Sequence, residues 1–184
     1  MIILASQSPR RSELLTRAGV SFTVRAAEID ESVRDGEAPQ QYVRRLAVGK
    51  AMAIPRGGDA CVLAADTTVV LGSEILGKPA DAADAVQMLT KLAGRTHEVI
   101  TGICLFYRSE LFIDAAVTAV RFGPMTPAEI DAYVATGEPM DKAGGYGIQG
   151  VASRYITGIE GCYFNVVGLP VSLVCRYLGK LGLL

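Results

Sequence analysis

The chain has 184 residues, half of them hydrophobic, and a formal net charge of −1 at pH 7. This length is typical of one domain with a sizeable core, and the charge balance argues against nucleic-acid binding, which needs a basic surface. No run of about 20 apolar residues is present to cross a membrane, so we expect a cytoplasmic protein whose four separated cysteines are buried apolar side chains, not disulfides or zinc ligands.

Strand and helix patterns alternate in the first half of the chain. Ser8 and Pro9 predict an N-cap and a first helical residue, and Pro39 predicts the start of a second helix. Apolar runs predict strands buried within a sheet. The predicted order is a strand at 2–4, a helix at 9–18, a strand at 20–26, an acidic loop at 27–38, a helix from 39, a turn at 55–59, and a strand at 61–65 that ends at Asp66 and resumes at 69–71.

The second half adds two long strands and three helices to the prediction. Asp81 predicts an N-cap, and Thr126 with Glu129 predicts a capping box. The predicted order is a hairpin strand at 74–76, a helix from 82 to 93, strands at 96–107 and 111–122, a helix ending at Gly137, a glycine-rich loop at 139–150, strands at 155–156 and 162–167, and a helix from 170. The sequence therefore predicts a single α/β domain over residues 1–184.

Two arginines lie in the first turn of the first predicted helix. Arg10 and Arg11 face the positive end of the helix dipole, which disfavours cations by about 0.3–1 kcal/mol each. Either they gather with free N–H groups around an anion, or they are solvated surface arginines.

Asp66 and Lys50 are the charged residues that most need an explanation. Asp66 follows an apolar run, and a buried unpaired carboxylate would cost several kcal/mol. It therefore needs a cation, either a metal or a lysine, or it lies at a strand end facing a cleft. The functional interpretation is a metal ligand or general base, and the structural one is a strand-end aspartate bonded to backbone. Lys50 lies at the end of the apolar face of its helix, where it either extends to solvent or reaches into a cleft. Lys78, between Gly77 and Pro79, is presented rigidly.

The segment 141–150 contains four glycines and Gln149. Glycines let a backbone approach a ligand closely, and the Gln149 amide offers a donor and an acceptor suited to a base edge. The spacing matches neither a Walker loop nor a dinucleotide fingerprint. His97 is the only histidine and is expected to be structural. Without a histidine cluster or a Ser-His-Asp set, phosphoryl chemistry is the class indicated.

Several short motifs together resemble the Maf family of nucleotide pyrophosphatases, and most closely the branch that acts on dTTP and UTP. The likeness covers nearly the whole chain, in order. It is carried by Ala5-Ser6-Gln7-Ser8-Pro9-Arg10-Arg11, Ala65-Asp66-Thr67, Gly77-Lys78-Pro79, Thr96-His97-Glu98-Val99, Thr101-Gly102, Asp141 to Gly150, and Val167-Gly168-Leu169-Pro170.

The resemblance implies hydrolysis of a nucleoside triphosphate between its α and β phosphates, with Mg²⁺ or Mn²⁺ as cofactor. The implied fold has a long twisted mixed sheet, flanked by helices, and a cleft between two lobes, as in inosine triphosphate pyrophosphatases. A homodimer is also implied. The catalytic carboxylate falls on Asp66, and a metal-associated acid on Glu31. The phosphate-binding positions fall on Ser8, Arg10, Lys50 and Lys78, and those that separate base preferences on Arg11, Thr67 and Gln149.

Two other functions stay open on the sequence. The chain could be a nucleotide-binding regulator of cell division and septum formation, with a pocket that hardly turns over. It could also be a purine house-cleaning pyrophosphatase on a similar fold. The set of Asp66, Lys50 and Lys78 favours an enzyme, and a panel of triphosphates would separate the purine from the pyrimidine activity.

Overall fold

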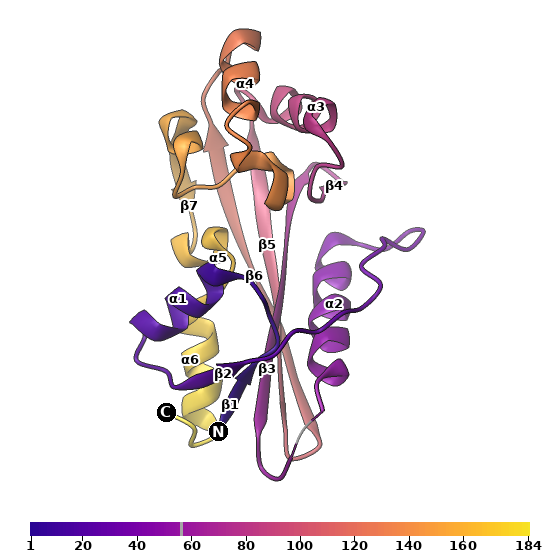
Figure 1. Cartoon of the computed structure of the whole chain (residues 1–184), viewed down its shortest axis with the longest axis vertical. Helices are drawn as coiled ribbons and strands as arrows, with labels where there is room; N and C mark the ends of the chain where they lie inside the picture. Colours follow the sequence, from indigo (N-terminus) through magenta and orange to yellow (C-terminus); the bar gives the residue numbers. More distant parts are fainter. Residues whose placement is uncertain (56) are drawn as a thin grey trace. The chain divides into compact units, whose positions relative to one another are not determined.

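The computed structural model describes residues 1–55 and 57–184; Arg56, in the predicted turn at 55–59, lies outside the described residues. Its strands are β1 (Ile2–Leu4), β2 (Phe22–Val24), β3 (Cys61–Leu71), β4 (Glu74–Leu76), β5 (Thr96–Tyr107), β6 (Glu110–Phe122) and β7 (Ile156–Glu160). They form a seven-stranded sheet in the order β2-β1-β3-β5-β6-β7, with β4 paired to β3 (Figure 1). Parallel and antiparallel pairs both occur, so the prediction of a mixed α/β sheet is confirmed.

The chain divides into two compact units. Unit 1 contains Met1–Thr67, Thr101–Ala116 and Gly168–Leu184, and unit 2 contains Thr68–Ile100 and Val117–Val167. The long strands β3, β5 and β6 each contribute one part to each unit.

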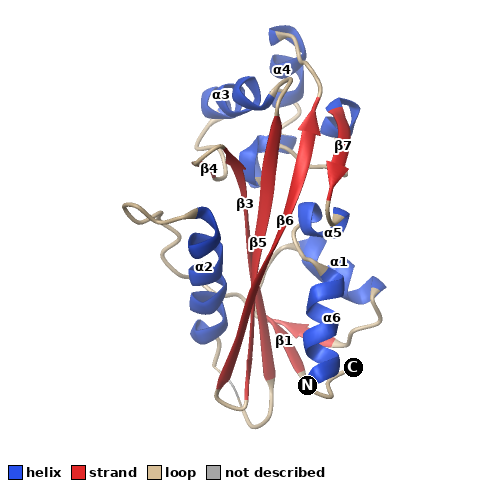
Figure 2. Ribbon diagram, turned by 180° about the vertical axis from the view of Figure 1, so that it is seen from behind, coloured by secondary structure: helices blue, strands red, loops and turns tan. Residues whose placement is uncertain are grey.

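In unit 1, helices cover both faces of the sheet. β1 runs parallel to both β2 and β3. The helix α2 (Pro39–Ala53) lies on one face, and α1 (Pro9–Arg17) and α6 (Val171–Lys180) lie on the other (Figures 1 and 2). Successive side chains of a strand point to opposite faces, so each residue of β3 in this unit faces either α2 or the α1–α6 layer.

Small side chains let α2 approach the sheet closely. Val62 and Ala64 of β3 pack with Ala47 and Ala51 of α2 in one buried cluster. On β5, a Cβ at Gly102 would lie only 2.5 Å from the carbonyl carbon of Val43. The alternation of β3 therefore continues from Val62 and Ala64 to Asp66, which faces α2 as well.

In unit 2, α3 (Ala82–Leu92) and α4 (Pro127–Val134) share a buried core with the strands. Both predicted N-caps are confirmed: the Asp81 side chain accepts a hydrogen bond from the Asp84 backbone, and Thr126 forms a capping box with Glu129. The 139–150 region contains two short 3-10 helices, η1 (Glu138–Asp141) and η2 (Ala143–Gly145), and η3 (Val151–Tyr155) follows.

Four predicted elements differ from the structure. β3 is continuous through Asp66, which is not at a strand end. β2 covers only 22–24, and β7 covers 156–160 in place of the predicted 155–156. The predicted strand at 162–167 is wrong, because Tyr163–Val167 forms a helix, α5.

None of the described helices combines the length and the apolar character needed to cross a membrane. None of the four cysteines, all of which are described, forms a disulfide; Cys61 and Cys104 are buried, and Cys162 and Cys175 are half-buried.

Candidate active site

Asp66 lies in the middle of β3 and is only 7% exposed. Its Oδ1 accepts a hydrogen bond from the Lys50 ammonium, with Nζ and Oδ1 2.6 Å apart. Lys50 projects from α2, on the sheet face to which Asp66 points. The alternation of β3 and the helical spacing of α2 thus bring two opposite charges together inside unit 1.

Lys50 pairs with a second carboxylate. Its Nζ lies 2.6 Å from Oε1 of Glu31, whose side chain is half-exposed. Lys50 itself is 9% exposed, so of the two alternatives left open by the sequence, extension to solvent is wrong. Removing one partner of such a buried pair leaves an uncompensated charge and costs about 3–5 kcal/mol. Lys50 is therefore the cation that allows Asp66 to be buried.

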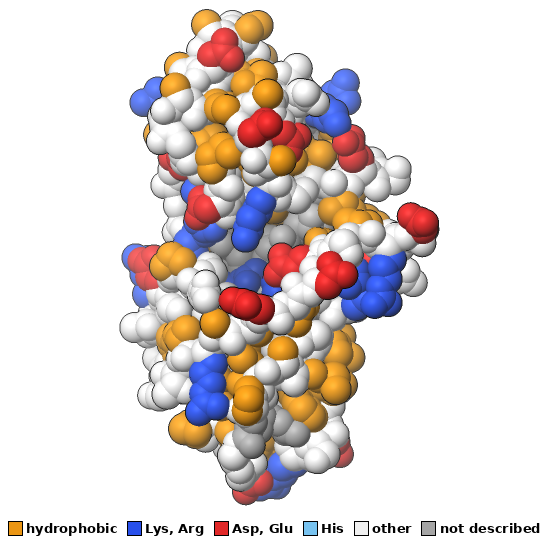
Figure 3. Space-filling view, turned by 45° about the vertical axis from the view of Figure 1, so that its right-hand side comes forward, with side chains coloured by type: hydrophobic (Ala, Val, Ile, Leu, Met, Phe, Trp, Pro, Cys, Tyr) orange, Lys and Arg blue, Asp and Glu red, His pale blue; other side chains and the backbone are white. Residues whose placement is uncertain are grey.

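The segment that carries Glu31 is tied to α2 although it has no regular structure. The Tyr42 hydroxyl donates to the Glu31 carbonyl at 3.0 Å, and Arg45 donates to the Ser32 carbonyl at 2.9 Å. Arg45 also forms a two-bond ion pair with Glu37. Burial, reinforced by the negative charges of Asp66 and Glu31, raises the pKa of Tyr42 to about 12. Figure 3 shows acidic side chains gathered along this segment.

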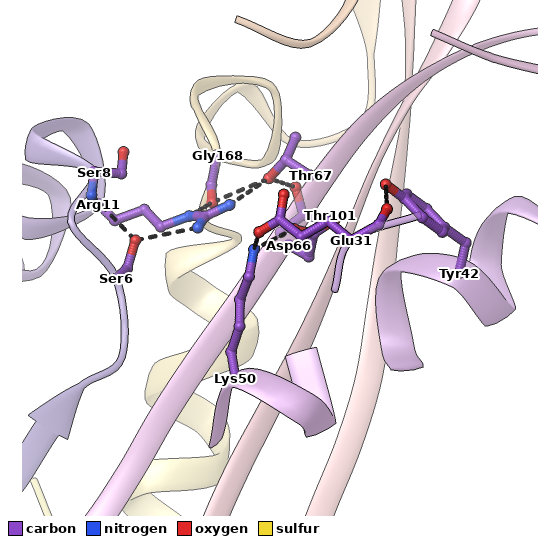
Figure 4. A network of polar contacts seen from close by, with 10 residues as sticks. All are labelled: Ser6, Ser8, Arg11, Glu31, Tyr42, Lys50, Asp66, Thr67, Thr101 and Gly168. Carbon is purple, nitrogen blue, oxygen red and sulfur yellow. Dashed lines mark hydrogen bonds and ion pairs between the residues drawn. The ribbon is translucent and has the colours of Figure 1, made fainter. Parts of the chain in front are cut away.

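Arg11 reaches β3 from the opposite helical layer (Figure 4). Its Nη2 donates to Thr67 Oγ1 at 3.0 Å, its Nε to the Gly168 carbonyl at 2.8 Å, and its Nη1 to Ser6 Oγ at 3.2 Å. Thr67 Oγ1 lies 2.9 Å from Thr101 Oγ1. Arg11 is thus bound to the protein and is not a solvated surface arginine.

The electrostatic setting of Arg11 follows from these contacts. Desolvation by the surrounding protein lowers the pKa of its guanidinium, while the Asp66 charge opposes the shift. An arginine nevertheless stays protonated at neutral pH. Three directed bonds fix the plane of its guanidinium, and a guanidinium has five N–H donors in total, so others remain for a bound anion.

Ser8 and Arg10 lie at the start of α1. Ser8 is the N-cap residue, as predicted, but its side chain makes no capping hydrogen bond. Its backbone N–H instead donates to Ser6 Oγ at 3.2 Å. Ser6 and Gly168 therefore organise this end of α1 and the Arg11 guanidinium. Neither residue has a role predicted from the sequence, although both lie in motifs that carry the resemblance.

Lys78 and Gln149 belong to unit 2 and are both exposed. The segments that carry them meet where the Gly144 N–H donates to the Gly77 carbonyl at 2.9 Å. Gly144 adopts a φ of +68°, and a Cβ there would lie within 3.0 Å of the Val69 side chain. Within unit 2, the structure thus joins the Gly77-Lys78-Pro79 segment to the glycine-rich segment.

His97 is buried in unit 2, at 2% exposure. Its Nε2 lies 2.6 Å from the Tyr146 hydroxyl, and its ring packs against Phe122 and Tyr146. Nδ1 has no hydrogen-bond partner among the described residues. Burial lowers the pKa of His97 to about 4, so the ring is neutral at physiological pH. Its packing agrees with the expected structural role, although one ring nitrogen is unsatisfied.

The described residues contain no group of three or more His, Cys, Asp or Glu side chains that could hold a metal ion. The nearest arrangement is the pair of carboxylates, Asp66 and Glu31, that converge on Lys50. Mg²⁺ is commonly bound by one or two carboxylates together with substrate phosphates, and not by a cage made only of protein ligands. The carboxylates of Asp66 and Glu31 are consequently suitable ligands for a metal ion that binds as a complex with a polyphosphate.

Comparison with known proteins identifies relatives along the whole chain. A dTTP/UTP pyrophosphatase of Anaeromyxobacter sp. (strain Fw109-5) is 54% identical over 98% of this chain and 89% of that protein. A dTTP/UTP pyrophosphatase of Geobacter sulfurreducens is 52% identical over 100% of this chain and 97% of that protein. The solved structure of the Staphylococcus aureus Ham1 protein aligns at 15% identity with a TM-score of 0.47, over 66% of this chain and 71% of that one.

The family comparison agrees with the two relatives. Residues 1–181 match the family described as "Maf-like protein". With this match and relatives at about half identity over most of their length, the chain belongs to the Maf family.

Proposed function

We propose that this chain is a nucleotide pyrophosphatase that hydrolyses dTTP and UTP to the monophosphate and pyrophosphate. The relatives that bear this name are half identical over nearly their whole length, which supports the same activity here. The observation that carries the proposal is the buried Asp66–Lys50 pair, because burying two charges is costly and rarely improves stability over an apolar packing. Because the buried pair adds little stability, we infer that the Asp66 carboxylate is retained for function.

In the mechanism we propose, Asp66 acts on the attacking water. Lys50 engages Oδ1, so Oδ2 is the oxygen that we assign to this water. The water oxygen forms a bond to the α-phosphorus while the bond from that phosphorus to the bridging oxygen breaks. Pyrophosphate leaves with the electron pair, and Asp66 holds the proton that the water loses.

We assign the binding of the phosphate groups to Ser8 and Arg10 at the start of α1, to Lys50 on α2 and, in unit 2, to Lys78. A helix N-terminus favours anions because its first N–H groups are unpaired, which suits the position of Ser8 and Arg10. Arg11, held against Thr67, and Gln149 would set the preference for a pyrimidine base.

A divalent cation, Mg²⁺ or Mn²⁺, belongs to the proposal. When bound, it supplies charge neutralisation on the phosphates and polarisation of the reacting phosphoryl group. Glu31 would hold it, with Asp66 as a second ligand if that residue is not the base. In either case Lys50 would share Glu31 with the cation, and it would share Asp66 as well if that residue is a ligand.

Turnover of a panel of nucleoside triphosphates with Mg²⁺ tests the proposal. We expect dTTP and UTP to be hydrolysed in preference to purine triphosphates, with pyrophosphate as a product. Release of orthophosphate would exclude cleavage between the α and β phosphates. Tight nucleotide binding without turnover would instead support the regulator of cell division.

The variant Asp66→Asn tests the role of the carboxylate. The amide can still accept the Lys50 hydrogen bond, so we expect nucleotide binding to be kept and turnover to fall by about 100-fold or more. Asp131→Asn, on the exposed side of α4, is the matched control and should turn over normally. The affinity for Mn²⁺, measured by titration calorimetry, separates the two roles proposed for Asp66. A lower Mn²⁺ affinity in Asp66→Asn indicates that Asp66 is a metal ligand, and an unchanged affinity indicates that it is the general base.

A further inference from the structure

The glycine-rich segment around Gln149 is held by the carboxylate of Glu138, which belongs to none of the motifs that indicate function. Glu138, at the start of η1, accepts a hydrogen bond through Oε1 from the Tyr133 hydroxyl at 2.9 Å. Through Oε2 it accepts a second bond from the Val151 backbone N–H at 3.0 Å. The Tyr133 hydroxyl in turn accepts the Gly147 N–H at 3.4 Å. One carboxylate thus restrains the backbone two residues before and two residues after Gln149.

The glycines of this segment make room for protein side chains. A Cβ at Gly150 would lie 2.0 Å from Glu138 Oε1, and a Cβ at Gly147 would lie 2.7 Å from Lys142 Cε. The expectation that glycines admit a ligand to the backbone is therefore not met at these two positions. Glu138 and Lys142 occupy that space, while Gln149 between the two glycines is exposed.

Further contacts fix the ends of the same segment. Lys142 Nζ donates to the Glu138 carbonyl at 2.7 Å, which closes η1 on itself. Tyr146 is buried and lies against His97, with its hydroxyl 2.6 Å from the ring nitrogen. The backbone on both sides of Gln149 is consequently anchored to the core of unit 2, and the exposed side chain of Gln149 extends from a backbone held in a defined position.

We propose that Glu138 is a positioning residue for base selection, acting through Gln149. A side-chain amide distinguishes one base edge from another only if it is held to within about 0.5 Å of the productive geometry. Glu138 supplies this restraint by joining Gly147, through Tyr133, to Val151. The inference rests on the proposed function, in which Gln149 contacts the pyrimidine.

The variants Glu138→Gln and Tyr133→Phe test the proposal. A glutamine retains one acceptor oxygen, and its NH₂ group cannot accept the Val151 N–H. Tyr133→Phe removes only the hydroxyl that bridges Glu138 and Gly147, so it probes the same restraint with the ring and its packing retained. Glu160→Gln, on the exposed end of β7, is the control for loss of one negative charge.

The measurement is kcat and KM for dTTP, UTP and dCTP with Mg²⁺. We expect both variants to lower the ratio of kcat/KM for dTTP over dCTP roughly tenfold, through KM more than kcat. The reason is that the Val151 or the Gly147 N–H loses its partner, so the backbone that carries Gln149 is no longer restrained. Glu160→Gln should keep the wild-type ratio. A general loss of stability would reduce the active fraction and kcat for all three substrates alike, with the ratio unchanged.

Gln149→Ala separates failure of this inference from failure of the proposed function. If Gln149→Ala lowers the dTTP to dCTP ratio and neither Glu138→Gln nor Tyr133→Phe does, the positioning role of Glu138 is overturned and the proposed function stands. If Gln149→Ala itself leaves the ratio unchanged, the assignment of Gln149 to base selection is wrong, and the positioning role of Glu138 falls with it.

Discussion

Acidification should destabilise unit 2 through His97. Burial lowers the pKa of this residue from 6.5 to about 4. Between these two pH values the unfolded chain binds a proton that the folded chain does not, so the free energy of unfolding falls as the pH drops. Among the described residues, the ring contacts the Tyr146 hydroxyl and the rings of Phe122 and Tyr146, and burial alone accounts for the shift of its pKa.

The size of the effect follows from the two pKa values. One pKa unit corresponds to about 1.4 kcal/mol, so the full shift is worth roughly 3 kcal/mol, of which about 2 kcal/mol is lost between about pH 7.5 and pH 5. This loss is a large fraction of the free energy of unfolding of an ordinary domain, which is roughly 5–15 kcal/mol.

Urea denaturation at the two pH values, followed by circular dichroism, measures this loss. His97→Gln is the comparison, because an amide can still meet the Tyr146 hydroxyl but does not titrate in this range. Carboxylates that titrate near pH 5 act in both proteins and cancel in the difference. We expect the pH-dependent loss to be smaller by about 2 kcal/mol in His97→Gln. Equal losses in the two proteins would refute the assignment of a low pKa to His97.

Three substitutions test other parts of the fold. Gly102→Ala should lower the free energy of unfolding by about 1–3 kcal/mol or more, because its Cβ would meet the Val43 carbonyl carbon at 2.5 Å; an unchanged urea midpoint would contradict this contact. Thr126→Ala should cost about 1 kcal/mol by removing the cap of the Glu129 N–H, and Thr126→Ser should restore it; equal melting temperatures for all three proteins would show that the cap is not stabilising. Arg11→Lys should lower both the melting temperature and the affinity for nucleotide, because one ammonium cannot replace three directed bonds; calorimetric affinity equal to wild type would exclude Arg11 from the site.

The elements that the sequence predicts well are those with local causes. The capping box of Thr126 and Glu129 and the N-cap at Asp81 involve residues three positions apart, so the pattern alone specifies the helix start. The long strands β5 and β6 also appear where predicted, and a two-residue turn at Arg108 and Ser109, both with positive φ, joins them.

The elements that were mispredicted depend on distant partners. Aspartate is disfavoured in strands, so Asp66 suggested a break; the ammonium of Lys50, from another element, allows β3 to continue through it. The aromatic and β-branched residues of Tyr163–Val167 favour a strand. In the fold, the Asn165 amide donates to the Val99 carbonyl and to Thr118 Oγ1, and these tertiary bonds hold the segment as a short helix.

The candidate site shows the same division. The residue types were recognised from motifs, but the sequence did not indicate that Arg11 binds Thr67 or that Lys50 joins two carboxylates. The sequence did not indicate a role for Glu138, because its partners, a tyrosine hydroxyl and a backbone N–H, are brought to it only when the chain folds. An acidic residue directly before a glycine-rich segment is the one signal that could have pointed to it.

The two carboxylates that share Lys50 belong to segments of different local stability. Asp66 lies within a strand of the sheet, whereas Glu31 lies on a segment without regular structure. Amide protons around Asp66 should accordingly exchange with solvent far more slowly than those around Glu31. An anion or cation that competes for this ion-pair cluster will therefore displace Glu31 first, and hydrogen exchange along residues 25–38 will report its arrival while β3 stays protected.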